Sequence, residues 1–314
     1  MKFTYESPDG TETVFSRDAE NYKLLKRYSG LAEIPVAFSS DRSPYQHGET
    51  LLDTLMEPRD VSFDILIQIP STYTTESSVF DNAIFDLMVF DADDISNLEL
   101  LQAQIATLSL ALNPLEGPGH LYYERDDGTI YRLNCSPNNS PVLDTSNRSD
   151  LHQKATLDFR AHDPFWYSGV PYVQSFITTI ANFFPWNIPW IIGTTTSRKT
   201  VVNAGNIEAP VIISIWGPIT DPVITNETSG KTIALDLELL EGDRFDITTG
   251  KNNNTALYTP VSTGIPVNGF PYITVASKFW TLLKGSNSIL FSCSTSTDGS
   301  GASLTWSDQF AGVF

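Results

Sequence analysis

The sequence has few cysteines and no long apolar run. Its 314 residues include two cysteines, Cys135 and Cys293, which are too few and too far apart for the disulfide framework of a small secreted protein. No run approaches the roughly 18 apolar residues that a membrane helix needs. The residues after Met1 lack the apolar core of a signal peptide. We therefore expect a protein made in the cytoplasm, without export or membrane insertion.

Basic residues are also scarce. The chain has 19 Lys and Arg against 37 Asp and Glu, a net charge of −18. Residues 1–165 carry 27 acidic and 12 basic residues, whereas residues 166–314 carry 10 and 7, and no Lys or Arg lies between Arg59 and Arg125. Nucleic-acid affinity depends on Lys and Arg at phosphates, so this surface is expected to repel DNA. A solvated acidic face that favours solubility is the plainer interpretation.

Motifs for catalysis or metal binding are missing. The histidines are scattered, at His47, His120, His152 and His162, and none is paired with cysteine at zinc-ligand spacing. The chain contains no Gly-x-Ser-x-Gly elbow and no phosphate-binding loop. Asp91, Asp93 and Asp94 resemble half a calcium loop but lack its Gly and closing Glu, so we interpret them as the start of a helix. We predict no enzyme, cofactor or metal site. A glycosidase carboxylate pair stays an open alternative, because its spacing is a property of the fold.

Alternating apolar residues predict strands. The pattern runs through 61–69, 155–161 and 233–239, and each segment has one apolar face. Residues 121–125 and 129–133 form a predicted hairpin, which Asp126-Asp127-Gly128 closes because Asp-Gly suits a tight turn. We therefore expect a mainly β protein.

One segment, about 94–112, has helical spacing instead. Its apolar residues recur every three or four positions: Ile95, Leu98, Leu101, Ile105, Leu108 and Leu112. Ser96 and Glu99 fit a capping box at the start, and Asn113-Pro114 ends the helix.

The chain length favours two domains. We predict an N-terminal β-barrel or sandwich with the helix over 1–167, a Pro- and aromatic-rich linker over 168–200, and a C-terminal β-sandwich over 201–314. The linker contains four close aromatic residues: Phe183, Phe184, Trp186 and Trp190. These side chains pack on their own domains or are buried by a neighbouring molecule, and both options stay open.

A series of short motifs runs through nearly the whole chain in a fixed order. They are Tyr45-Gln46-His47-Gly48, Asn113-Pro114, Leu121-Tyr122-Tyr123, Asp163-Pro164-Phe165-Trp166, Asn203-Ala204-Gly205-Asn206, Ala209-Pro210-Val211, Gly217-Pro218, Asp221-Pro222-Val223-Ile224 with Asn226, Thr228-Ser229-Gly230, Glu241-Gly242-Asp243, Ser277-Lys278-Phe279-Trp280 with Asn287, and Phe310-Ala311-Gly312-Val313. Together they resemble the distal tail protein (Dit) family of siphophages.

This resemblance implies a tail-tube-like N-terminal β-barrel with one helix and a galectin-like C-terminal β-sandwich. It also implies a homo-hexameric ring at the virion tail tip, made in the host cytoplasm, that joins the tail-tube (major tail) protein to the tail-associated hub protein. The ring docks receptor-binding proteins or side fibres, and DNA passes through its lumen without specific binding. Residues 71–94 are an apparent extra loop relative to the simplest members.

Two other functions remain as alternatives. The C-terminal sandwich is a carbohydrate-binding module if Trp216, Trp280 or Trp306 presents an aromatic face, although tryptophans at strand positions are more often core. A tail-associated glycosidase or peptidase is disfavoured because the sequence shows neither a nucleophile motif nor a metal motif.

Overall fold

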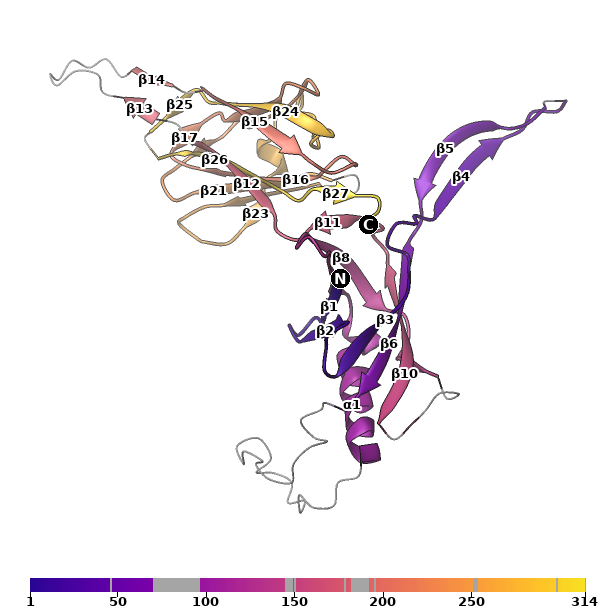
Figure 1. The fold of residues 1–314 in the computed structure, drawn as a ribbon. Coiled ribbons are helices and arrows are strands. Elements are labelled where there is room, and N and C mark those ends of the chain that lie inside the picture. The colour runs from indigo at the N-terminus through magenta and orange to yellow at the C-terminus, as the bar shows by residue number, and fades with distance from the viewer. Residues whose placement is uncertain are drawn as a thin grey trace, which may run out of the picture. The chain divides into compact units, whose positions relative to one another are not determined.

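A computed structural model describes residues 1–45, 47–69, 97–144, 149, 151–177, 179–181, 192–194, 196–250, 254–297 and 299–313. The chain divides into two compact units. Unit 1 comprises Met1–Gly169 with Ala311–Phe314, and unit 2 comprises Val170–Phe310. Strands dominate both units, and the described residues contain one α-helix. The predicted mainly β fold class with a single helix is confirmed (Figure 1).

Unit 1 begins with strands and contains the helix. Its elements are β1 (Lys2–Glu6), β2 (Glu12–Ser16), β3 (Tyr22–Ser29), β4 (Val36–Asp41), β5 (Thr50–Met56), β6 (Arg59–Gln68), α1 (Asn97–Ala111), the 3-10 turn η2 (Pro114–Glu116), β7 (Gly119–Glu124), β8 (Ile130–Pro137), β9 (Val142–Leu143), β10 (His152–Ala161) and β11 (Trp166–Ser168).

The strands of unit 1 close into a barrel. Pairing runs in the order β8-β7-β1-β2-β3-β6-β10, and β10 also pairs with β8 through Phe159 and Pro137, which returns the sheet to its start. The predicted hairpin is confirmed, since Glu124 of β7 faces Ile130 of β8 across the Asp-Gly turn. The predicted alternation is also confirmed: alternate apolar residues of β6 and β10 point inward, and Val61, Ile65 and Leu157 are buried.

Stacked aromatic rings fill the barrel. The ring of Phe63 lies 4.7 Å from that of Phe3 and 5.7 Å from that of Phe159, measured between centroids. Offset aromatic pairs add about 0.5–1.5 kcal/mol each beyond their burial. Rings from β1, β6 and β10 therefore tie distant parts of the chain together.

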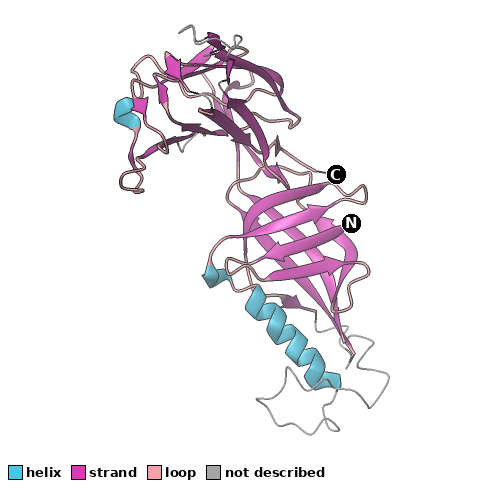
Figure 2. Cartoon of the chain, turned by 90° about the vertical axis from the view of Figure 1, so that its left-hand side faces the viewer, coloured by secondary structure: helices cyan, strands magenta, loops and turns pink. Residues whose placement is uncertain are grey.

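Helix α1 lies beside the barrel strands and contacts β6 (Figure 2). Leu101, Leu108 and Leu112 of the predicted stripe are buried, and the Tyr22 hydroxyl donates to the Gln104 carbonyl at 3.1 Å. The described helix starts at Asn97, so the predicted start over 94–96, with the Ser96 cap, lies outside the described residues.

Unit 2 consists of short strands. They are β12 (Tyr172–Ile177), β13 (Thr179–Ala181), β14 (Ile192–Thr194), β15 (Thr196–Asn203), β16 (Val211–Trp216), β17 (Ile219–Thr220), β18 (Val223–Asn226), β19 (Lys231–Ala234), β20 (Glu238–Leu239), β21 (Arg244–Thr248), β22 (Thr255–Thr259), β23 (Val267–Asn268), η4 (Phe270–Tyr272, a 3-10 turn), β24 (Gly285–Ser292), β25 (Thr295–Ser296), β26 (Gly301–Trp306) and β27 (Gln309–Phe310).

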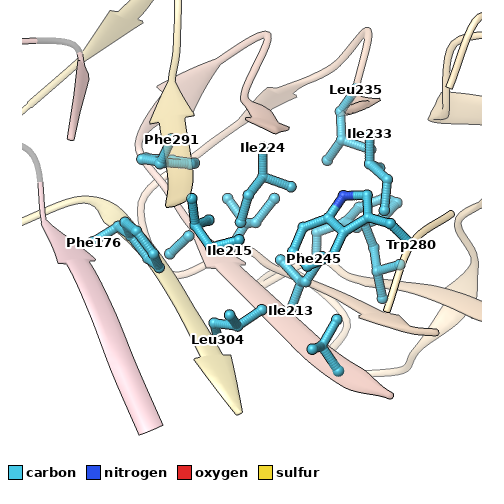
Figure 3. Close-up of a cluster of buried hydrophobic side chains, with 14 of the residues drawn as sticks. Phe176, Ile213, Ile215, Ile224, Ile233, Leu235, Phe245, Trp280, Phe291 and Leu304 are labelled. Carbon is cyan, nitrogen blue, oxygen red and sulfur yellow. The ribbon is translucent and has the colours of Figure 1, made fainter. Parts of the chain in front are cut away.

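The main sheets of unit 2 share one apolar core. A six-stranded sheet has the order β12-β26-β16-β21-β22-β23, and a four-stranded sheet has the order β15-β24-β18-β19. Side chains from both sheets, such as Ile213 and Phe245 from the first and Ile224 and Phe291 from the second, meet in the core (Figure 3). Each strand therefore gives alternate residues to this core and the rest to its outer face.

Buried polar side chains fix the loops of unit 2, and they come from the sequence motifs. The Asn203 amide nitrogen donates to the carbonyls of Ile207 (2.8 Å) and Leu282 (3.2 Å), while its oxygen accepts from the Gly205 amide. Asn287 bonds in the same way to Leu283, at 3.0 and 2.7 Å. These motif residues therefore hold the loops in place.

Three segments differ from the sequence-based expectation. Within the expected linker, β12 pairs with β26, and the start of β15 pairs with β24. Pro171 precedes β12 and so does not interrupt its pairing. The aromatic cluster Phe183, Phe184, Trp186 and Trp190 lies outside the described residues. The segment 233–239 keeps its alternating burial but divides between β19 and β20, since the Asp236 amide bonds to the Tyr272 carbonyl at 2.9 Å. At the C-terminus, residues 311–313 belong to unit 1 and not to the sandwich.

Candidate assembly interface

Strands β4 and β5 form a hairpin that projects from the barrel of unit 1 (Figure 1). We call residues 36–56 the arm. Val36 pairs with Met56 and Phe38 with Thr54, and the register shifts after Ser39. The two strands pair only with each other, so the described arm forms a sheet of its own.

Apolar side chains of the arm face solvent. The exposed fractions are 68% for Phe38, 59% for Leu51, 64% for Leu52 and 58% for Leu55. Directly paired residues share a face, so Phe38 and Leu55, which occupy successive pairs, point to opposite faces. A two-stranded hairpin is marginally stable alone in water, and its apolar faces need a partner. Among the described residues, the arm therefore has the properties expected of an interface element.

The tip of the arm carries the motif Tyr45-Gln46-His47-Gly48. Tyr45 has a positive φ of 67° and is fully exposed, and Gly48 has a φ of 81°. A positive φ is costly for a residue with a bulky side chain, so this turn holds the tyrosine ring outward at a conformational cost. Gln46 lies outside the described residues.

The base of the arm is tied firmly to the barrel. Arg59, at the start of β6, is fully buried, and its guanidinium donates to the carbonyls of Gly30 (3.2 Å), Leu31 (2.8 Å) and Ala311. Burial lowers the pKa of Arg59 to about 10, so the group stays charged at neutral pH. The Val313 amide also donates to the Leu31 carbonyl at 3.1 Å. The C-terminal residues therefore help to hold the root of the arm.

A second exposed apolar patch lies at the edge of the sheet. Among the described strands, β9 pairs with β10 on one side and ends the sheet order on the other. Val142 and Leu143 of β9 are exposed, as is the neighbouring Leu151. An open edge with apolar side chains is a template for pairing with another chain. We call these residues the β9 edge.

The acidic residues of the base-free stretch are only partly described. Asp64 is buried, where it accepts from Thr156 (2.7 Å) and pairs with Lys154 (3.1 Å). Asp60 pairs with Arg160 at 3.6 Å, and Glu124 pairs with Lys2 at 3.6 Å. The remaining described acids, Glu99 and Glu116, are exposed. The acids from 76 to 94, together with the extra loop 71–94, lie outside the described residues.

The structure also places the residues considered for chemistry. Within the described ranges, no three His, Cys, Asp or Glu side chains group as metal ligands would. Burial raises the pKa of the Cys135 thiol. Trp280 and Trp306 lie in the core of unit 2, whereas Trp216 is partly exposed on the outer face of its sheet. No helix in the described part of the chain is long and apolar enough to cross a membrane.

The family described as siphovirus-type tail component, C-terminal domain, matches residues 204–310. No curated protein matches the chain. The matched residues 204–310 include Ala204, Gly205 and Asn206, which follow Asn203 in the turn. They also include the buried side chains of Asn226, Asp243 and Asn287.

Three solved structures are similar over nearly the whole chain. The Dit protein of phage SPP1, described as a paradigm of the hub adsorption apparatus in phages that infect Gram-positive bacteria, has a TM-score of 0.61 and 11% identity over 98% of this chain and 99% of that one. A chain of the phage p2 baseplate in its activated conformation with strontium has a TM-score of 0.46 and 11% identity, over 98% of this chain and 97% of that one. A chain of the same baseplate with calcium has a TM-score of 0.45 and 10% identity, over 99% of each chain. The family match supports the resemblance for residues 204–310, and the likeness to SPP1 Dit shows that the two chains share a fold.

Proposed function

We propose that this chain, whose residues 204–310 belong to the siphovirus-type tail component family, is a structural adaptor of a phage tail tip. Six copies form a ring that joins the tail-tube protein to the tail-associated hub protein. The ring docks receptor-binding proteins or side fibres. The role is structural and not catalytic.

The exposed apolar arm carries this proposal. Full burial of a Leu or Phe side chain contributes about 1.5–3 kcal/mol. Phe38, Leu51, Leu52 and Leu55 are each about 60% exposed in the single chain. If a neighbouring copy covers all four, they contribute about 4–7 kcal/mol to each contact between subunits. This gain is a substantial part of what a subunit contact needs, because association itself costs about 4–15 kcal/mol in lost translational and rotational freedom.

A closed ring requires two different patches on each subunit. Such head-to-tail contacts are heterologous, so one patch docks onto a different patch of the next copy. The arm and the β9 edge are two distinct apolar patches of unit 1. We therefore assign the ring contacts to unit 1 and the docking of fibres or receptor-binding proteins to unit 2. The fold shared with SPP1 Dit, described as a paradigm of a hub adsorption apparatus, supports the structural role but not this division between the units.

The charge of the chain suits the passage of DNA through the ring. The net charge of residues 1–165 is −15, and these residues form most of unit 1. Phosphates are repelled by carboxylates, so an acidic wall lets DNA pass without binding. We expect exposed acids of the base-free stretch, such as Glu99 and Glu116, to contribute to the lumen or its rim.

Native mass spectrometry of the purified full-length protein tests the ring. We expect a dominant species with six times the mass of one chain, and particles with a central hole in negative-stain images. Addition of the neighbouring tail-tube protein stabilises the ring if subunits dissociate on dilution. A protein that remains a monomer with and without the tail-tube protein contradicts the proposal.

A further inference from the structure

The outer face of the six-stranded sheet of unit 2 carries a compact group of polar and aromatic side chains. On strand β16, Ile213 and Ile215 point into the core (Figure 3). The alternation along the strand therefore places Ser214 and Trp216 on the outer face. On strand β21, Phe245 and Ile247 are buried, so Arg244 and Asp246 point outward. The two pairs share the same face because β16 and β21 are adjacent.

The strand register brings these four side chains into one block. Trp216 lies directly opposite Arg244, and Ser214 lies directly opposite Asp246. Directly paired residues have Cβ atoms about 4.5–5.5 Å apart. We call Ser214, Trp216, Arg244 and Asp246 the Trp216 block.

Hydrogen bonds fix the geometry of the block. The Ser214 hydroxyl donates to Oδ1 of Asp246 at 2.5 Å, and Nε of Arg244 donates to the same oxygen at 2.9 Å. A terminal guanidinium nitrogen of Arg244 donates to the Ser214 hydroxyl at 3.2 Å. The Trp216 indole nitrogen donates to the Gly299 carbonyl at 2.8 Å, which sets the orientation of the ring.

The block keeps groups available for a ligand. In the described part of the chain, the hydrogen bonds of Asp246 reach Oδ1, which leaves Oδ2 as an acceptor. The Arg244 side chain is 60% exposed and can donate to a second group. On its other side Trp216 pairs with Gly301, which has no side chain to cover the indole ring. Arg244 and Asp246 neutralise each other, so the block suits a neutral ligand.

We propose that the Trp216 block binds a neutral pyranose saccharide. The C–H face of a pyranose ring packs on an aromatic ring, and its hydroxyls pair with a few fixed donors and acceptors. The indole of Trp216 supplies the first contact, while the Asp246 carboxylate and the Arg244 guanidinium supply the second. This binding site goes beyond the adaptor role and is independent of ring formation. It would give the tail tip a direct contact with surface carbohydrate.

Fluorine NMR of the full-length protein tests the site. The protein is labelled with 5-fluorotryptophan, and Trp216→Phe identifies the Trp216 signal by its loss. Glucose, galactose and N-acetylglucosamine are then titrated separately to about 50 mM, well above a dissociation constant of about 1 mM, which is typical of a small weak site. We expect at least one sugar to shift the Trp216 signal with saturation, while the Trp166 and Trp280 signals stay unchanged because these rings are buried.

Two variants separate binding from a general effect on the sheet. Asp246→Asn removes the charged acceptor and is expected to weaken binding at least tenfold. Thr255→Ala changes a polar residue of β22 outside the block and is expected to leave binding unchanged. If Asp246→Asn does not fold, Ser214→Ala takes its place. The proposal is overturned if none of the three sugars gives a saturable shift of the Trp216 signal. It is also overturned if Asp246→Asn, or Ser214→Ala in its place, binds as tightly as the wild type.

Discussion

Removal of the apolar side chains of the arm is expected to break the ring without unfolding the chain. The double variant Phe38→Ser and Leu55→Ser changes one residue on each face of the arm, and both side chains are more than half exposed in the single chain. Substitution of exposed residues usually changes stability by less than about 0.5 kcal/mol. The melting temperature of the barrel should therefore stay close to that of the wild type.

The effect on assembly follows from the area that the neighbour would cover. Each side chain has roughly 60% of its surface available, so its burial contributes about 1–2 kcal/mol to an interface. Loss of both costs about 3 kcal/mol, which weakens each contact roughly 150-fold. The penalty applies at every interface of the ring, so the ring should be replaced by monomers and short open oligomers.

Mass photometry over a dilution series measures this change. The control is Leu110→Ser on α1, which removes a side chain that is 73% exposed but lies outside both the arm and the β9 edge. We expect the control to assemble as the wild type does. Assembly of the arm variant at the same concentration as the wild type would refute the assignment of the arm as the interface.

Three further predictions concern the β9 edge, the base of the arm and a loop of unit 2. Val142→Lys places a charge on the β9 edge and should block assembly, while circular dichroism should show that the monomer stays folded. Normal ring assembly by this variant would show that the β9 edge is not an interface. Arg59→Met removes three hydrogen bonds and should lower the unfolding free energy of unit 1 by about 2–4 kcal/mol in urea titrations, and an unchanged midpoint would show that the anchor is dispensable. Burial raises the pKa of Asp243, but hydrogen bonds from Val261, Leu240 and Tyr258 outweigh it and leave the pKa below its ordinary value. Because the folded pKa is depressed, this stabilisation is present above the ordinary Asp pKa and is lost as the pH falls through the folded value. Asp243→Asn should remove that part of the acid sensitivity, whereas an identical stability profile below pH 4 would contradict it.

Strands with one buried face could be predicted from the sequence. In β6 and β10, alternate residues such as Ile65 and Leu157 are buried within the chain, so burial leaves a two-residue period in the sequence. The hairpin of β7 and β8 was predictable because Asp127-Gly128 favours a tight turn, and Gly128 has the positive φ, 82°, that such a turn needs. The predicted apolar stripe of the helix is confirmed at Leu101 and Leu108, because the helix buries one face and this leaves a helical period in the sequence.

The arm could not be predicted in this way. Neither of its faces is buried within the chain, so no alternation distinguishes Leu51, Leu52 and Leu55 from a loop. The motif at its tip, with Tyr45, contributed only to the family resemblance and did not predict a hairpin. Of the three tryptophans considered for sugar binding, the pattern alone did not separate Trp216 from Trp280. Only the burial of Ile213 and Ile215 in the structure shows that Trp216 lies on the outer face of β16.

Cryo-electron microscopy of the tail tip in intact virions tests the central claim most directly. The account predicts one closed ring of six copies, in which the arm of each subunit packs on the next subunit and covers Phe38 and Leu55. A single copy of this chain at the tail tip, or a ring whose arms extend into solvent, would contradict it.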